Sequence, residues 1–277
     1  MGGCYAERLA ARFSDPGQPY HGFAERTPSG GRWTGKVALV PDALTLPLRW
    51  RKPRHIFVNS MSDLFHEGLS NENIAGIFGI MNAARRHTLQ VLTKRAARMR
   101  AFFVWLSEQT GHKDRWVESV AQAEAICGEP RGARGAENHP VECVAVHGFA
   151  EALLSHQMRG MYVNWPLPNV WLGVSVEDRA RKARIDDLRH TPAAVRFLSL
   201  EPLLEDLGTI DLSSIGWVIV GAESGPNSRP MEEGWVRSIR DQCIEASVPF
   251  FYKQRCVNGR KISTPEIDGR VWREMPA

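Results

Sequence analysis

The chain has 277 residues, of which 43% are hydrophobic and 24% charged. This composition is typical of a globular protein and excludes disordered, collagen-like and disulfide-scaffold chains. The longest apolar runs, such as Trp217–Val220, are far shorter than the ~20 residues of a membrane helix, so we expect no membrane span.

The charge balance is mild and cysteines are few. Lysine and arginine number 35 and aspartate and glutamate 31, which gives a formal net charge of +4. Five cysteines fit a reducing compartment better than a disulfide framework. The first residues, Met1–Arg8, contain no apolar run that could serve as a secretory signal. We therefore expect a cytoplasmic protein.

Seven short segments rich in β-branched and aromatic residues predict strands. In chain order they are Val37–Val40, His55–Met61, Thr88–Lys94, Val170–Glu177, Val195–Glu201, Trp217–Glu223 and Pro249–Gln254. Helical patterns between them cover Asn71–Arg86, Ala96–Leu106, Asp178–Arg189 and Glu232–Ala246.

Strands that alternate with helices predict parallel βαβ units, and near-continuous apolar runs predict strands covered on both faces. We expect a single α/β domain over residues 1–277, either a (βα) TIM-like barrel or a large open sheet. The barrel is favoured because polar residues gather where the predicted strands end, which is where barrels hold their functional groups.

A long interval, residues 107–168, breaks the alternation and predicts an insertion on one face of the domain. It contains a helical stretch at Trp116–Cys127 and a polar segment at Gly128–Pro140. Four of its residues have donor types suited to zinc: Cys127, His139, Cys143 and His147. Their spacing is irregular, so ordinary loop and helix residues remain the alternative interpretation.

A pattern of small residue, spacer and glutamate follows three predicted strands, at Ser175–Glu177, Ser199–Glu201 and Gly221–Glu223. Alternate residues of a strand share a face, so each small residue and its glutamate point the same way. If the three faces point into one lumen, three carboxylates converge there. The alternative is that each glutamate caps a following helix or pairs with a lysine.

Further polar side chains are expected at the same strand ends. Carboxylates held close together repel unless cations or hydrogen-bond donors lie between them, so basic residues here are plausible partners. The candidates are Asn59, Lys94, Lys253, Ser224 and Arg229. The loop Gly221–Pro230 could also bring backbone amides close to an anionic ligand, although a plain strand-to-helix turn has the same pattern.

Seven segments together carry a family resemblance: Cys4–Arg8, Phe57–His66, Gln90–Arg95, Trp171–Glu177, Glu201–Leu204, Trp217–Gly225 and Phe250–Gln254. In this order they resemble a phage-associated radical-SAM-like protein family of unknown function. The resemblance implies a [4Fe-4S] cluster held by three cysteines, with one iron open to S-adenosylmethionine, and a 5′-deoxyadenosyl radical as the product of its cleavage.

By the resemblance, Cys4 is a cluster ligand and the last of the three cysteines, and the first two have no counterpart here. The same resemblance implies that the cofactor and substrate cavity is lined by Ser175, Glu177, Ser199, Glu201, Glu223 and Ser224. The glutamates would hold the methionyl ammonium group. Lys94, Arg229 or Lys253 would hold its carboxylate.

The missing cysteines predict that the first barrel strand is also missing. We therefore expect an incomplete barrel of about seven parallel strands, with an open seam between Val37–Val40 and Pro249–Gln254. Either the start of the chain is assigned too late, or the chain is a natural remnant. One thiolate cannot hold a cluster in the usual way, so we expect this chain to be inactive as a radical enzyme.

Two other function classes stay open. A nucleic-acid-associated binding protein would use the basic clusters Arg49–Arg54 and Lys94–Arg100, which solvated surface residues would resemble. A metal-dependent barrel hydrolase would use Glu177, Glu201 and Glu223 as acid, base or metal ligands.

Overall fold

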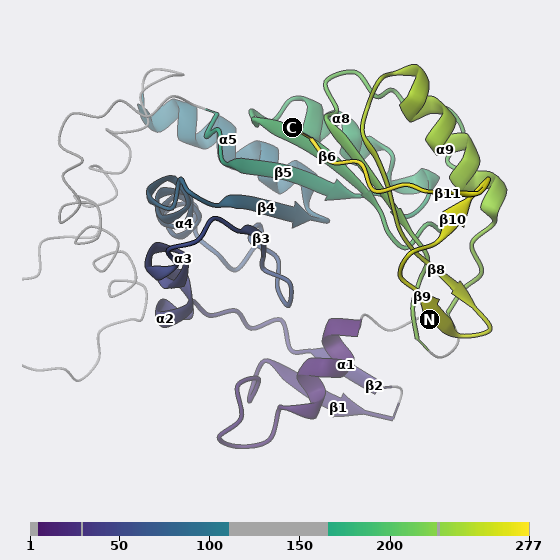
Figure 1. Cartoon of the computed structure of the whole chain (residues 1–277). Coiled ribbons are helices and arrows are strands. Elements are labelled where there is room, and N and C mark those ends of the chain that lie inside the picture. Colours follow the sequence, from purple (N-terminus) through teal and green to yellow (C-terminus); the bar gives the residue numbers. More distant parts are fainter. Residues whose placement is uncertain (1–4, 29, 111–165, 226–227, 277) are drawn as a thin grey trace, which may run out of the picture.

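A curled sheet of seven strands forms the centre of the computed structural model, in the order β3-β4-β5-β6-β7-β8-β9 (Figure 1). Strands β3 to β8 are all parallel, and β9 is antiparallel to β8. The architecture is a mixed α/β half-barrel. The structure describes residues 5–28, 30–110, 166–225 and 228–276.

Six of the seven predicted strands are confirmed, as β3 to β8, and the last strand of the sheet, β9, was not predicted. The sheet consists of β3 (His55–Val58), β4 (Thr88–Thr93), β5 (Val170–Ser175), β6 (Val195–Leu200), β7 (Trp217–Gly221), β8 (Phe250–Val257) and β9 (Arg260–Ile262). The predicted strand Val37–Val40 is wrong, because this segment has no regular secondary structure. The open edges of the sheet are therefore β3 and β9, and the opening does not lie between Val37–Val40 and Pro249–Gln254 as expected.

The four predicted helices are present with shifted ends: α4 (Asn71–Ala83), α5 (Ala96–Thr110), α8 (Ala183–Arg189) and α9 (Glu233–Glu245). A short 3-10 turn, η1 (Arg179–Arg181), precedes α8. The Ser70 side chain caps α4 by accepting a 3.2 Å hydrogen bond from the Asn73 amide. No helix lies between β6 and β7 in residues 201–216, so the βα alternation is incomplete there.

The first part of the chain forms a unit that the sequence patterns did not predict. Helix α1 (Tyr5–Arg12) packs on a hairpin of β1 (Ala24–Thr27) and β2 (Gly30–Trp33), below the sheet in Figure 1. A β-carbon at Gly31 would lie 2.0 Å from the Glu7 carbonyl oxygen, so only glycine permits this close approach.

Four further short elements complete the structure: α2 (Pro41–Leu44), α3 (Leu46–Arg49), β10 (Glu266–Ile267) and β11 (Arg270–Val271). Of the predicted insertion, residues 107–110 continue α5. The predicted helix Trp116–Cys127 and the zinc-type residues Cys127, His139, Cys143 and His147 lie outside the described residues. The single-domain division of residues 1–277 stays a prediction.

The two faces of the sheet are covered in different ways. On one face, aliphatic side chains such as Leu172, Val174 and Val218 belong to the main core, together with residues of α4, α5, α8 and α9. On the other face, Trp171, Phe197 and Trp217 form a separate buried cluster, with partly buried side chains such as Leu92 and Ile219 packed against it. Both faces of β5 are therefore buried, as its continuous apolar sequence predicts.

The last residues of the chain close the amino-terminal end of this aromatic face. The Glu274 carbonyl accepts a 2.9 Å hydrogen bond from the Trp217 indole, and Phe251 forms an antiparallel bridge with Arg273. The Glu274 amide also donates to the Phe250 carbonyl at 3.1 Å. This segment thus keeps the buried aromatic rings away from water.

Gly173 gives the Phe197 ring its place across β5. A β-carbon at Gly173 would lie 2.4 to 2.6 Å from three ring atoms of Phe197, which is itself 1% exposed. Gly173→Ala is expected to destabilise the fold by about 1–3 kcal/mol through overpacking, measured by urea unfolding. The control is Gly76→Ala in α4, where nothing lies within 4 Å and alanine favours the helix. Equal stability of Gly173→Ala and the wild type would contradict this packing.

Candidate functional site

The candidate site is the edge of the sheet where the parallel strands end. Ser175 and Ser199 are register partners on β5 and β6, so the residues two positions later also lie side by side. Glu177 and Glu201 therefore follow adjacent strands on the face of the aromatic cluster. By the same register Gly221 of β7 is level with Glu201, and Glu223 follows two positions later, beyond the end of β7. All three carboxylates thus lie at the edge where the parallel strands end.

The Glu177 carboxylate is held by two cations. Its Oε1 lies 2.6 Å from Lys94 Nζ, and its Oε2 lies 2.9 Å from Arg184 Nη1. The Arg184 Nη1 also donates to the Ser175 carbonyl at 2.7 Å. Arg184 thereby links α8 to the end of β5, and Glu177 is fixed between β4 and α8.

The Glu201 carboxylate lies over β7 because Gly221 leaves room for it. A β-carbon at Gly221 would lie 2.2 Å from Glu201 Oε1. Glu201 Oε2 lies 3.0 Å from Lys253 Nζ and accepts a 3.3 Å hydrogen bond from Ser199. Its Oε1 is buried without a hydrogen-bond partner in the described structure.

The Glu223 carboxylate is bound by Arg229 through three donors. Arg229 donates from Nε, Nη2 and its backbone amide, each at 2.9 Å. These hydrogen bonds lower the pKa of Glu223, and the nearby charge of Arg8 contributes. The pKa of Arg229 is raised chiefly by its hydrogen bonds to Glu223 and to a smaller extent by the charges of Asp178 and Glu177. The ends of β5 and β7 therefore share one electrostatic environment.

In three of these pairs the carboxylate is mostly buried and its cation is about half exposed. The side chains of Glu177, Glu201 and Glu223 are 9%, 15% and 17% exposed. Their partners Lys94, Lys253 and Arg229 are 59%, 52% and 49% exposed. In these three pairs it is therefore the cation that offers hydrogen-bond donors to solvent. We call Lys94, Lys253 and Arg229 the cationic rim.

Two arginines of the site were missed by the sequence analysis. Arg184 lies seven residues after Glu177 on the following helix, a spacing that could have indicated it. Arg8 comes from α1, and its guanidinium lies 3.3 Å from where a β-carbon of Gly225 would be. No local pattern indicated Arg8, because its place near Gly225 depends on how the first unit packs.

Asp63 holds the backbone at Lys94, the first residue of the cationic rim. Its carboxylate accepts hydrogen bonds from Thr93 Oγ1 at 2.8 Å and from the Lys94 amide at 3.3 Å. Arg95 Nη1 lies 3.0 Å from Asp63, and Arg95 Nε lies 2.9 Å from Glu67. Asp63 and Glu67 are thus both paired with Arg95.

The remaining predicted site residues lie near the edge without joining these pairs. Asn59 follows β3 with a φ of 60°, and its side-chain amide donates to Ser62 at 2.6 Å. Ser224 is exposed in the loop after β7. Both residues therefore keep their predicted place at the strand ends, and their roles stay predictions.

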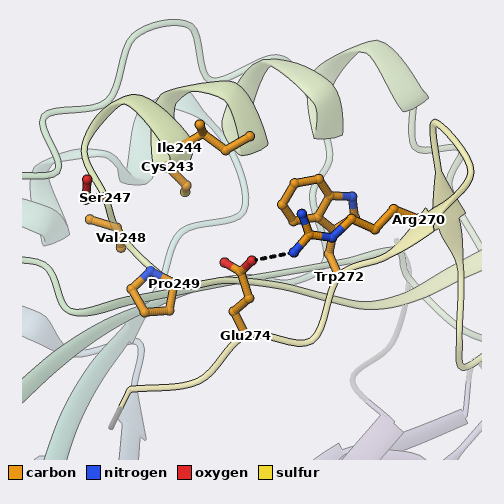
Figure 2. Close-up of a pocket in the computed structure, with 8 residues that line it drawn as sticks. All are labelled: Cys243, Ile244, Ser247, Val248, Pro249, Arg270, Trp272 and Glu274. Atoms are coloured by element: carbon orange, nitrogen blue, oxygen red, sulfur yellow. Dashed lines mark hydrogen bonds and ion pairs between the residues drawn. The ribbon is translucent and has the colours of Figure 1, made fainter.

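A hollow of about 470 Å³ lies elsewhere, at the start of β8 (Figure 2). It is lined by Cys243, Ile244, Ser247, Val248, Pro249, Arg270, Trp272 and Glu274. Its two charged side chains already pair, since Arg270 Nη2 lies 2.9 Å from Glu274 Oε1. Because strands β3 to β8 are parallel, this hollow is at the end opposite to the cationic rim.

The fold and this edge define the class of protein: an α/β half-barrel with a charged rim at the carboxyl ends of its strands. The chain matches the family described as "Protein of unknown function (DUF5131)" over residues 2–276 and belongs to that family. No curated protein and no solved structure matches it.

The expected radical-SAM identity is wrong. The family that matches is one of unknown function, and no radical-SAM family matches the chain. Within the four described ranges, no group of three or more histidine, cysteine, aspartate or glutamate side chains is arranged to hold a metal ion. Each glutamate expected to hold the methionyl ammonium is already paired with a cation of the chain.

The described thiols do not fit the implied iron–sulfur cluster. Cys243 is 0% exposed, and its burial raises its pKa to about 12. Cys256 shares a 3.0 Å hydrogen bond with Ser228. Cys4, the predicted cluster ligand, lies outside the described residues.

No helix in the described part of the chain has the length and apolar character needed to cross a bilayer.

Removing the guanidinium of Arg229 should change the titration of Glu223. Its lowered pKa means that the contact stabilises the fold above the carboxyl's ordinary pKa of 4.5 and is lost as the pH falls through the lowered value. Arg229→Gln should raise the pKa of Glu223 and weaken the loss of stability in acid. An NMR titration of the carboxyl checks this, with Arg270→Gln as control. An unchanged pKa in Arg229→Gln would show that another group holds Glu223.

Cys243 should be inert in the native state because it is buried and protonated at neutral pH. We expect a thiol reagent at pH 8 to label the partly exposed Cys256 at least about tenfold faster than Cys243, with both labelled at similar rates after unfolding. Peptide mass spectrometry over time measures this. Equal native rates would contradict the burial of Cys243 on the core-facing side of α9.

Proposed function

We propose that the protein binds a small ligand with a phosphate or carboxylate group at the cationic rim. The observation that supports this proposal is the arrangement of the ion pairs, with buried carboxylates and exposed ammonium and guanidinium groups. A buried carboxylate that already has its cation has little capacity left for a ligand cation. The exposed cations can still donate further charge-assisted hydrogen bonds to an anion.

The position of the rim supports the same proposal. In parallel α/β sheets, ligands bind outside the carboxyl ends of the strands, because the loops that leave those ends can vary without disturbing the core. We propose accordingly that the half-barrel is related to the (βα) TIM-like barrels. Arg8, which packs against Gly225 and whose charge acts on Glu223, would add a second guanidinium near Arg229.

A metal-dependent hydrolase that uses the three glutamates is less well supported. Metal binding would require Glu177, Glu201 and Glu223 to turn away from Lys94, Arg184, Lys253 and Arg229. Breaking these pairs would leave charged groups only partly solvated, which is costly. An anionic ligand requires no such rearrangement.

The test removes one pair of the rim without changing the net charge. Calorimetric titration with pyrophosphate is compared in the wild type and in Glu201→Gln/Lys253→Gln. We expect a loss of affinity of about tenfold or more, since one charge-assisted hydrogen bond is worth about 1.5–3 kcal/mol. The control is Arg100→Gln/Asp187→Asn, which neutralises a 3.4 Å ion pair between α5 and α8.

Two results would contradict the proposal. One is wild-type protein that binds neither pyrophosphate nor inorganic phosphate. The other is equal affinity in the rim variant and the control variant. Thermal unfolding of both variants distinguishes lost binding from lost structure.

A further inference from the structure

A second basic surface lies at the opposite end of the sheet, where β3 begins. Its cations come from two segments, the end of α3 with the loop that follows it and the residues after α4, which are about 30 positions apart in sequence. We call it the basic patch, and its members are Arg49, Arg51, Lys52, Arg54, Arg85 and Arg86. All six side chains are exposed.

Hydrogen bonds to backbone carbonyl groups bring the two segments together. Arg86 Nη1 donates to the Trp50 carbonyl at 3.4 Å, and the Thr88 amide donates to the Arg54 carbonyl at 2.9 Å. The His87 ring lies 2.9 Å from the Pro47 carbonyl oxygen. Helices α3 and α4 accordingly lie next to each other in Figure 1.

The basic patch differs from the other basic cluster of the sequence in its partners. In Lys94–Arg100, Lys94 pairs with Glu177, Arg95 with Asp63 and Glu67, and Arg100 with Asp187. No member of the basic patch forms an ion pair with any residue that the structure describes. These six positive charges are therefore not balanced by a described neighbour.

We infer that the basic patch binds the phosphate backbone of a nucleic acid strand. Five of its six cations are arginines, whose planar guanidinium matches a phosphate with two hydrogen bonds. The Arg54 guanidinium is held 4.6 Å over the Trp50 ring by a cation–π contact, which orders it before a ligand arrives.

Aromatic side chains beside the patch favour nucleic acid over an acidic protein. His55 and Phe57 are exposed on the same face of the edge strand β3, and Phe57 is 48% exposed. Single strands are bound by basic grooves combined with rings on which bases stack. Phosphate contacts supply the affinity, and the rings supply a surface for unpaired bases.

The test uses a matched pair of double variants. Arg51→Ser/Lys52→Ser removes two cations of the patch, and Arg260→Ser/Lys261→Ser removes an exposed Arg-Lys pair from β9. Fluorescence anisotropy with labelled oligo(dT) is recorded at several salt concentrations. The patch variant should bind about tenfold more weakly at low salt, and its dependence of log affinity on log salt should be shallower by roughly 0.7 per removed cation.

Three results would overturn the inference: no salt-dependent binding by the wild type, equal loss of affinity in both variants, or equal competition by poly-glutamate or by phosphatidylserine vesicles at the same charge concentration. Pyrophosphate binding at the cationic rim should be unchanged in the patch variant. The inference about the patch and the proposed function can therefore fail separately.

Discussion

The structure depends on a sheet that must be buried on both faces, and the described residues cover the two faces in different ways. Aliphatic residues such as Val174 and Val218 face α4, α5, α8 and α9. The opposite face is protected at its amino-terminal end by the cluster of Trp171, Phe197 and Trp217 and by the last residues of the chain. Toward the carboxyl ends of the strands this face carries the three glutamates and the cations that pair with them.

At that edge, the cost of burying carboxylates determines the charge of the surface. A carboxylate that is largely removed from water needs a cation or several donors. Glu177, Glu201 and Glu223 each obtain one from another segment of the chain. Because the long Lys and Arg side chains reach the acids while keeping their charged ends in water, the exposed group of each pair is the cation.

The rim and the basic patch lie at opposite ends of the sheet, since Lys94 follows β4 and Arg54 precedes the parallel strand β3. The cations of the two surfaces differ in whether an acidic side chain pairs with them. Those of the rim are held by acids and so have defined positions. Those of the patch are not paired with any described acid, so their attraction for a polyanion is the larger of the two and the more sensitive to salt.

Periodicity in the sequence was enough to predict six strands, four helices and the common face of the three glutamates, because these properties depend on neighbours within a few residues. Val37–Val40 was wrong because a short β-branched run is not a strand without a partner. The partners of the glutamates, the approach of Arg8 to Gly225 and the union of Arg49–Arg54 with Arg85 and Arg86 were decided by tertiary structure alone. These contacts join segments far apart in the chain, and their energies depend on distance and burial, which local sequence patterns do not contain.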